Sequence, residues 1–379
     1  MHKFKIILPI IAVISLMSCS EKAVISDQIT MLVTTNVRGQ LDPCGWKANP
    51  LGGLPRRSTY INEVRQGGLD PILLDAGDAL FELTILPKGK EASSKLRART
   101  VLESTKKMGN YVYNIGQNDF AAGLGFLREM EDSYETRFIS SNLFNSGTED
   151  LAFKGHAIIE RSGYKIGVFG IITDLPASIK ELELKDAVST IQSKVSELRP
   201  QVDILVMLLN ANRLQLDKIV AQTTDVDYIF SSRETSRTRP ERKQADGKPM
   251  LYTMGIQGKY LGRVDLKIAD INMPFNDVTG SLMTAQLFQE RLNNLQRKNP
   301  DKPLEEVYKN NNNVLNMVQK FKQGLKDSKE SMVDVKNTSF YGLIPLNGNV
   351  ASEKALLSLV DQTLKTCESL DKESSSTLP

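Results

Sequence analysis

Short apolar runs alternate with helical patterns from residue 28 to about residue 268. Several runs are apolar at nearly every position, above all "ILVMLL" and "IGVFGII", as is typical of strands covered on both faces. We predict strands over residues 29–34, 72–75, 111–115, 156–161, 165–172, 203–209, 226–230, 250–254 and 261–268. Helical spacing predicts helices over residues 54–65, 93–108, 123–130 and 188–198. The alternation indicates an α/β sheet sandwich rather than an all-helical or all-β fold.

The pattern changes after residue 272. Residues 281–297 and 303–326 are rich in charged side chains, Asn and Gln, with apolar residues three and four apart, such as Phe288, Leu292 and Leu295. This spacing predicts an intramolecular helical hairpin joined at "KNPDK", and a partner-binding coiled coil is the alternative. An apolar extended segment, "FYGLIPLNGNV", then precedes a last helix at residues 352–367 and a disordered polar tail.

The first residues, "MHKFKIILPIIAVISLMSCS", combine a basic start with an apolar run that is too short to span a bilayer, which is typical of a secretory signal. The four residues that end at Cys19 resemble the bacterial lipobox, in which cleavage leaves the cysteine as a lipid-modified N-terminus. A plain signal peptide is the alternative. We therefore predict export and lipid anchoring to the cell envelope, at the outer membrane if the cell has one, since Ser20 resembles the outer-membrane sorting pattern.

Composition narrows the class of protein only a little. The 379 residues are 40% hydrophobic and 25% charged, which is typical of a globular protein with a sizeable core. A net charge of +3 does not point to nucleic acid, and we predict no nucleic-acid partner. If Cys19 is acylated, Cys44 and Cys367 remain, either paired with each other or free. The chain has no Cys-x-x-Cys-His, which excludes covalent haem attachment.

Polar stretches follow several predicted strands, where ligands of open α/β sheets usually bind. They are "TTNVRG", "LLDAGD", "IGQNDF", "LLNAN" and "IFSSRET". Their order and spacing resemble the 5'-nucleotidase type of calcineurin-like metallophosphoesterase. That family carries Asp-x-His-Gly, Gly-Asp, Gly-Asn-His-Glu, a histidine after an apolar strand, and Gly-His-x-His. "GGLPRRSTYINEVR", "YKIGVFGIIT" and "GKYLGRVDLKI" extend the resemblance over residues 29–268. It implies a four-layer αββα sandwich, here with the helical hairpin appended.

The resemblance also implies two metal ions that clamp a phosphate and activate a water. Asp78 keeps the bridging carboxylate, and Asp119 takes the place of the family's glutamate. The other matching positions are exchanged, and they are Asn36, Arg38, Gln117, Asn118, Asn210, Arg233 and Thr235. Beyond the signal, the only histidine is His156, on a predicted strand away from these motifs. A two-metal site of this type needs several imidazoles, so we predict no catalytic residues, no bound metal and no cofactor. The alternative is an oxygen-ligand site for Mg²⁺ or Ca²⁺ at Asp78 and Asp119, with Asp75.

Arg38 and Arg233 place fixed positive charges where the family holds its metals, and two interpretations stay open. The guanidinium groups bind a phosphate or another anion without hydrolysing it, helped by the loop "RETSRTRPERK". Alternatively, they pair with Asp78 and Asp119 and replace the metal as counter-charge.

A last motif, "DPCGW", resembles a branch of the family that carries Asp-Pro-Cys-Gly-Cys, with Cys44 kept and Trp46 in place of the second cysteine. The family's C-terminal substrate domain has no counterpart here. We predict a catalytically inactive binding or scaffold protein, held at the membrane by lipidated Cys19 and with an envelope protein as a further partner. The alternative is a metal-dependent phosphohydrolase centred on Asp78.

The predicted organisation has six segments. They are a lipoprotein signal peptide (1–19), a tether (20–28), a metallophosphoesterase-like domain (29–272), a helical hairpin (273–335), a C-terminal extended segment and helix (336–369), and a disordered tail (370–379).

Overall fold

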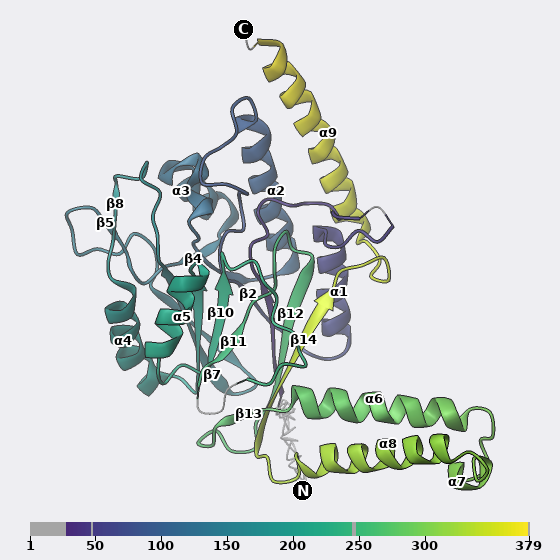
Figure 1. Cartoon of the computed structure of the whole chain (residues 1–379). Helices are drawn as coiled ribbons and strands as arrows, with labels where there is room; N and C mark the ends of the chain where they lie inside the picture. Colours follow the sequence, from purple (N-terminus) through teal and green to yellow (C-terminus); the bar gives the residue numbers. More distant parts are fainter. Residues whose placement is uncertain (1–27, 47, 245–247, 378–379) are drawn as a thin grey trace, which may run out of the picture.

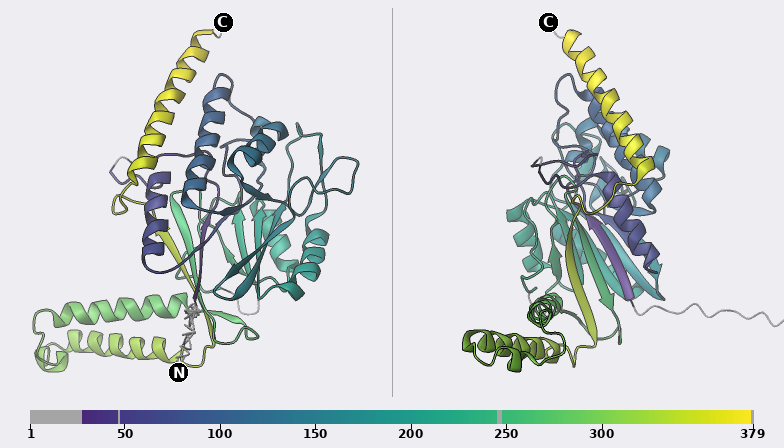
Figure 2. Two further views of the ribbon diagram at one scale, coloured as in Figure 1. Left: turned by 180° about the vertical axis from the view of Figure 1, so that it is seen from behind. Right: turned by 90° about the vertical axis from the view of Figure 1, so that its right-hand side faces the viewer.

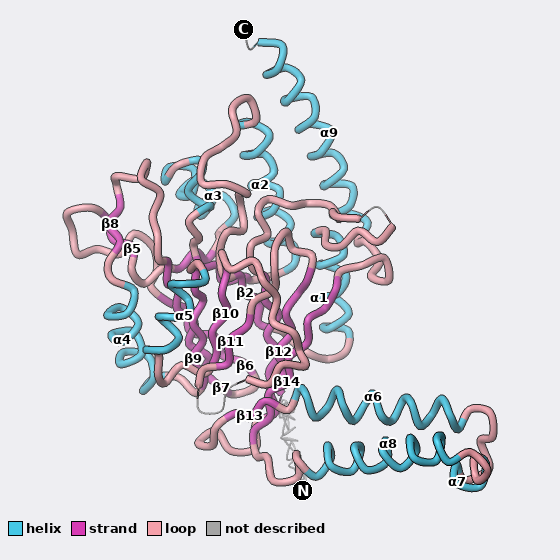
Figure 3. Tube along the Cα trace, in the orientation of Figure 1, coloured by secondary structure: helices cyan, strands magenta, loops and turns pink. Residues whose placement is uncertain are grey.

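The computed structural model describes residues 28–46, 48–244 and 248–377. Two sheets pack face to face, and helices cover both outer faces, which gives four layers (Figures 1 and 3). The predicted αββα sandwich is therefore confirmed. The predicted signal peptide, Cys19 and nearly all of the tether lie outside the described residues. The described contacts of the folded part all lie within residues 28–377, so a chain that begins at residue 20 retains them.

The larger sheet has the strand order β13-β14-β12-β1-β2-β3-β4. Its strands are β1 (Gln28–Thr34), β2 (Ile72–Asp75), β3 (Tyr111–Asn114), β4 (Arg137–Ile139), β12 (Tyr260–Lys267), β13 (Phe275–Asp277) and β14 (Asn337–Pro345). Strands β1 to β4 are parallel, and β12 runs antiparallel to both β1 and β14. The apolar segment "FYGLIPL" thus lies largely in β14, a strand of the larger sheet.

The second sheet has the order β11-β10-β9-β7-β6. Its strands are β6 (His156–Arg161), β7 (Tyr164–Ile172), β9 (Ile204–Asn210), β10 (Tyr228–Ser232) and β11 (Met250–Tyr252), and a small separate pair is formed by β5 (Leu143–Asn145) and β8 (Leu182–Leu184). All strands of the second sheet except β6 are parallel. Alternate residues of the central strands enter different cores, which explains why these strands are apolar throughout.

Four helices pack on the larger sheet and two on the second (Figure 2). They are α1 (Leu54–Gln66), α2 (Glu91–Met108), α3 (Leu124–Tyr134) and α9 (Lys354–Thr377) on one side, and α4 (Ala187–Leu198) and α5 (Arg213–Gln222) on the other. The sequence pattern missed the three-residue strands β4, β5, β8 and β13, which are too short for a periodic signal, and it missed α5, which has only ten residues. None of the described helices is long and apolar enough to cross a membrane.

The predicted hairpin is present as α6 (Thr279–Gln296) and α8 (Asn312–Glu330), with the short helix α7 (Leu304–Val307) at its tip. Its own apolar cluster includes Leu292, Val318 and Phe321, and Phe288 stacks on Phe321 with ring centroids 5.5 Å apart. Gly324 allows this close packing, because a Cβ there would lie 2.1 Å from the Phe288 ring. The two helices therefore partner each other within the chain.

The prediction of a disordered tail from residue 370 is wrong for residues 370–377, which continue helix α9. Leu356, Val360 and Cys367 bury one face of this helix against the domain, and Thr363 hydrogen-bonds Thr100 of α2 at 3.0 Å. Once that part is docked, adding further residues to the helix costs little, because helix growth is cooperative. Cys367 and Cys44 are both free, so they do not form a disulfide in this structure.

Candidate functional site

The exchanged motifs meet at one end of the sandwich, at the carboxyl ends of the parallel strands of both sheets. Asn36 follows β1, Asp78 follows β2 and Asp119 follows β3, while Asn210 ends β9 and Arg233 follows β10. This is the upper end of the strands in Figure 1, opposite the hairpin. The order of the motifs along the sequence therefore does predict a common location in space.

The backbone at this end is strained in a pattern that coincides with the exchanged residues. Four of the eight described non-glycine residues with positive φ lie here: Asn36 (50°), Arg38 (59°), Asp78 (57°) and Arg233 (66°). Non-glycine residues seldom adopt this left-handed conformation, and such residues cluster at functional sites. The left-handed backbone conformation therefore occurs at three exchanged positions, Asn36, Arg38 and Arg233, and at the retained Asp78.

Asn36 joins three loops. Its amide Nδ2 donates to the carbonyl oxygens of Glu234 (3.0 Å) and Gly255 (2.9 Å), and its Oδ1 accepts the backbone N–H of Arg233 at 2.6 Å. The side chain is fully buried, so these bonds are shielded from water. All of its polar atoms are engaged, which leaves Asn36 a structural role in holding the loops together.

Asp119 accepts three backbone hydrogen bonds. Its Oδ2 accepts from the N–H groups of Gly116 (2.8 Å) and Asp78 (3.0 Å), and its Oδ1 accepts from Leu80 at 2.8 Å. Burial, followed by the nearby carboxylate of Asp78, raises the pKa of Asp119 well above its ordinary value. Both oxygens are thus occupied by the loop after β2 and the turn after β3.

Asp78 is the one retained ligand position, and its two oxygens differ. Oδ1 accepts the backbone N–H of Asn118 at 2.9 Å, whereas Oδ2 is buried without a hydrogen-bond partner among the described residues. Burial raises the pKa of Asp78, while the Asn118 N–H, the Asn210 amide and the charges of Arg38 and Arg233 oppose that rise. The arginines therefore act on this carboxyl as nearby charges.

Asn210 is held in a chain of hydrogen bonds between the two sheets. Its Oδ1 accepts the backbone N–H of Gln117 at 3.1 Å, and its Nδ2 donates to Ser232 Oγ at 2.8 Å. Ser232 in turn donates to the carbonyl of Ala76 at 2.7 Å. An amide that replaces a histidine here ties β9 to the loops after β2 and β3.

The interpretation that both arginines form ion pairs with Asp78 and Asp119 is wrong as to the partners, although the charges of both arginines oppose the rise of the Asp78 pKa. The ion pair of Arg233 is with Asp174, which follows β7 and also accepts a hydrogen bond from Gln215 Nε2 at 2.8 Å. Burial raises the pKa of Asp174, but the bonds from Gln215 and Arg233 outweigh it and hold the pKa below its ordinary value. Arg38 forms no ion pair with a described residue, and its Nε is buried without a partner.

The side chains of Thr235, His156 and Asn118 point away from this cluster, although the backbone N–H of Asn118 donates to Asp78. Thr235 is exposed and lines a separate cavity of about 260 Å³ with Arg237 and Tyr260. His156 lies on β6 at 3.7 Å from Glu197 of α4, and burial followed by the charge of Lys194 lowers its pKa. Asn118 turns its amide outward to the carbonyl of Glu82 at 2.7 Å.

Asp75, named as a residual ligand, is a buried strand-end carboxyl. Its Oδ1 accepts the backbone N–H of Gly77 at 2.9 Å, and its Oδ2 accepts the Thr34 hydroxyl at 2.6 Å. Burial raises the pKa of Asp75 to about 6 against the opposing effect of the Arg57 charge. Its two oxygens therefore support the ends of β1 and β2.

The residues present do not fit a two-metal centre. Within the described ranges, no three His, Cys, Asp or Glu side chains are grouped so that they could hold a metal ion. Asp119, Asn36 and Asn210 already use their polar atoms within the protein. Of the carboxyl and amide oxygens at the described motif positions, only Asp78 Oδ2 is buried without a hydrogen-bond partner, and one oxygen does not make a site for a divalent cation, which takes about six ligands.

Asp174, Gln215 and Ser232 complete the site but were not predicted. Asp174 comes directly after the apolar strand "YKIGVFGIIT", so the rule that strand ends carry the site would have found it. Ser232 lies within the strand-end motif "IFSSRET", but nothing in the motif singles it out. Gln215 carries no such signal, because a glutamine in a helix occurs throughout proteins.

The four-layer sandwich, the strand order and the loops at the strand ends define the class of protein: this chain has the calcineurin-like metallophosphoesterase fold. Within that fold, it is a relative of the 5'-nucleotidase type. Protein UshA of Yersinia enterocolitica is 27% identical over 131 residues, 34% of this chain and 22% of UshA. A probable 5'-nucleotidase of Treponema pallidum is 24% identical over 189 residues, 48% of this chain and 31% of that protein. No family model matches the chain.

Solved structures agree on the fold. A 5'-nucleotidase precursor from Thermus thermophilus superposes with a TM-score of 0.54 at 19% identity, over 64% of this chain and 52% of that one. The calcineurin-like phosphoesterase YfkN of Bacillus subtilis gives a TM-score of 0.57 at 14% identity, over 92% of this chain and 99% of that one. The matches to the two curated relatives span less than a third of the relatives' own lengths.

Proposed function

We propose that this protein is a non-catalytic member of the metallophosphoesterase fold, anchored to the cell envelope through lipidated Cys19, that acts by binding rather than by hydrolysis. One observation carries the proposal. At the strand ends where the resemblance implies metal ligands, the side chains of Asn36, Asp119 and Asn210 are committed to hydrogen bonds between loops. A residue that is committed in this way supports the fold and is not free to coordinate an ion.

The test of inactivity uses the chain from residue 20. We expect no stoichiometric metal by mass spectrometry, and no turnover of a generic phosphodiester or of nucleotides with Mn²⁺, Mg²⁺ or Ca²⁺. The Asp78→Ala variant serves as the matched blank, because Asp78 is the only retained ligand position. Stoichiometric metal, with turnover that Asp78→Ala abolishes, would instead establish the alternative, a phosphohydrolase centred on Asp78.

The test of anchoring uses the complete chain in a bacterial host. Labelled fatty acid is expected to enter the wild-type protein, which sediments with membranes, and to be absent from the Cys19→Ala variant. Cys44→Ala is the control, since Cys44 lies inside the folded domain beside Gln257. Equal labelling of the wild type and Cys19→Ala would show that Cys19 is not the lipidated residue.

A further inference from the structure

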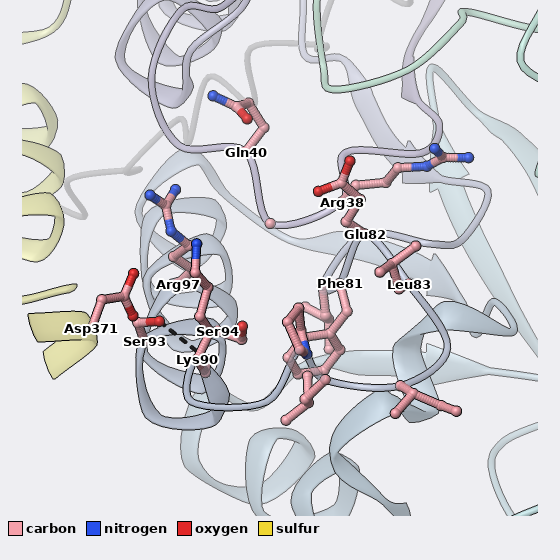
Figure 4. Close-up of a pocket in the computed structure, with 15 residues that line it drawn as sticks. Arg38, Gln40, Phe81, Glu82, Leu83, Lys90, Ser93, Ser94, Arg97 and Asp371 are labelled. Carbon is pink, nitrogen blue, oxygen red and sulfur yellow. Dashed lines mark hydrogen bonds between the residues drawn. The ribbon is translucent and has the colours of Figure 1, made fainter. Parts of the chain in front are cut away.

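A cavity of about 330 Å³ lies next to the exchanged site and shares Arg38 with it. Its walls come from the residues after β1, the loop between β2 and α2, the first turns of α2, and the C-terminal part of α9 (Figure 4). The walls near the site are fixed by the backbone: Arg38 N–H donates to Asp78 O and Gly39 N–H to Ala79 O, both at 2.9 Å. The size is at the lower end of the range for small-molecule sites.

Charged side chains of both signs line this cavity without neutralising one another. The cations are Arg38, Lys90 and Arg97, and the anions are Glu82 and Asp371. None of the five forms an ion pair with another described residue. Two of their atoms, Arg38 Nε and Asp371 Oδ1, are buried and have no hydrogen-bond partner in the described part of the chain. Such atoms are costly unless something else in the cavity meets them.

The charges are divided between two sides of the cavity. Figure 4 shows Arg97 and Asp371 together on one side, and Arg38 with Glu82 on the other. A guest on the first side would meet the Arg97 cation and the unsatisfied acceptor Asp371 Oδ1, and a guest that also reaches the second side would meet Arg38. With three cations against two anions, the walls carry an excess of one positive charge, so an anionic guest is favoured over a cationic one.

The apolar part of the lining comes from one loop, between β2 and α2, whereas Gln40, Ser93 and Ser94 add uncharged polar groups from other segments. Leu80 and Phe81 are buried, while Leu83 and Ile85 are 56% and 74% exposed. Isolated exposed apolar residues are ordinary, but these two border a cavity whose other walls are charged. The lining therefore offers an apolar surface beside the cations.

We propose that this cavity binds an amphipathic anion, a small molecule that carries one phosphate or carboxylate and an apolar body. Arg97 and Lys90 hold the anionic group, and Asp371, on the same side, accepts a hydrogen bond from a hydroxyl of the guest. Arg38 adds positive charge from the opposite side, and Leu83 and Ile85 contact the apolar body. Helix α9 completes the site, because Asp371 is the lining residue that it contributes. The inference rests on the proposed function in that the protein acts by binding, and it names the chemical class of the guest.

The test measures binding of octyl phosphate to the chain from residue 20 by calorimetry, below the concentration at which the probe forms micelles. We expect one octyl phosphate to bind per chain. Inorganic phosphate, which lacks the apolar body, and octanol, which lacks the anionic group, should each bind at least about tenfold more weakly. The Arg97→Gln variant is expected to weaken the binding of octyl phosphate about tenfold, and so is the double variant Leu83→Ser, Ile85→Ser. Arg97 is half-buried on α2 beside Cys367 of α9, so urea unfolding of Arg97→Gln must show that the variant is folded.

Matched controls separate the cavity from general surface effects. Lys88→Gln removes a charge from the same loop outside the cavity, and Leu214→Ser removes an apolar residue that is 76% exposed on α5; both should bind as the wild type does. Inorganic phosphate that binds as tightly as octyl phosphate, uptake of many probe molecules, or an unchanged Arg97→Gln would each overturn the proposal. Release of phosphate from bound octyl phosphate would overturn the proposed lack of catalysis but leave the binding site standing.

Discussion

Replacing Asp119 by alanine is expected to lower the free energy of unfolding by more than about 3 kcal/mol. The side chain accepts the backbone N–H groups of Asp78, Leu80 and Gly116, and the site is fully buried. Each buried donor that loses its acceptor costs about 1–3 kcal/mol, because water cannot reach it in the folded state. Relief of the carboxyl's own burial offsets part of this loss. Urea unfolding at neutral pH measures the difference.

Asp119→Asn separates hydrogen bonding from charge. The amide oxygen can still accept from Asp78 and Gly116, whereas the amide nitrogen would face the N–H of Leu80, so we expect an intermediate loss. Asp132→Ala, an exposed carboxyl on α3, is the control and should change stability by no more than about 0.5 kcal/mol. If Asp119→Ala unfolds within about 1 kcal/mol of the wild type, the three backbone bonds do not hold this loop as described.

Asp119 shows how the loops at this end of the sandwich are held together, because its carboxyl accepts backbone hydrogen bonds from the loop after β2 and from the turn after β3. Here the same loops are joined by amide and backbone hydrogen bonds, and Arg233 binds Asp174 instead of a carboxylate of the cluster. Asn36, Asn210 and Arg233 therefore each supply a hydrogen-bonding or charged partner to a neighbouring loop, which stabilises the fold at this end of the sandwich.

Much of this arrangement could be predicted from the sequence, because the signals for strands and for the loops that follow them lie in short stretches of neighbouring residues. Continuously apolar runs such as residues 204–209 can only be strands covered on both faces, and polar residues directly after them must lie at one edge of the sheet. The pairing of Arg233 could not be predicted, because several carboxylates end strands at that edge and only side-chain direction selects Asp174. The cavity beside Arg38 was also beyond the sequence, since α9 joins it from the far end of the chain.

Replacing Asp75 by asparagine is expected to stabilise the protein at neutral and alkaline pH and to leave it unchanged near pH 4. In the folded state the pKa of Asp75 is about 6, against an ordinary value of 3.8. The folded state therefore binds this proton more tightly than the unfolded state, and the wild type loses stability as the pH rises from about 4 through 6. Two pKa units correspond to about 3 kcal/mol above pH 7, a loss that a neutral side chain avoids.

The asparagine can keep both hydrogen bonds of Asp75. Its oxygen accepts from the N–H of Gly77, and its amide donates to the Thr34 hydroxyl, which turns to donate to the carbonyl of Leu74 at 3.4 Å. The measurement is urea unfolding of both proteins from pH 4 to pH 8, and the readout is their difference at each pH, because Asp78 and Asp119 also have raised pKa values and tilt both curves alike. Asp132→Asn should give a difference near zero throughout. A difference for Asp75→Asn that does not grow between pH 4 and pH 7 would mean that this carboxyl is ionised at little cost, and that Arg57 and the two hydrogen-bond donors compensate its burial fully.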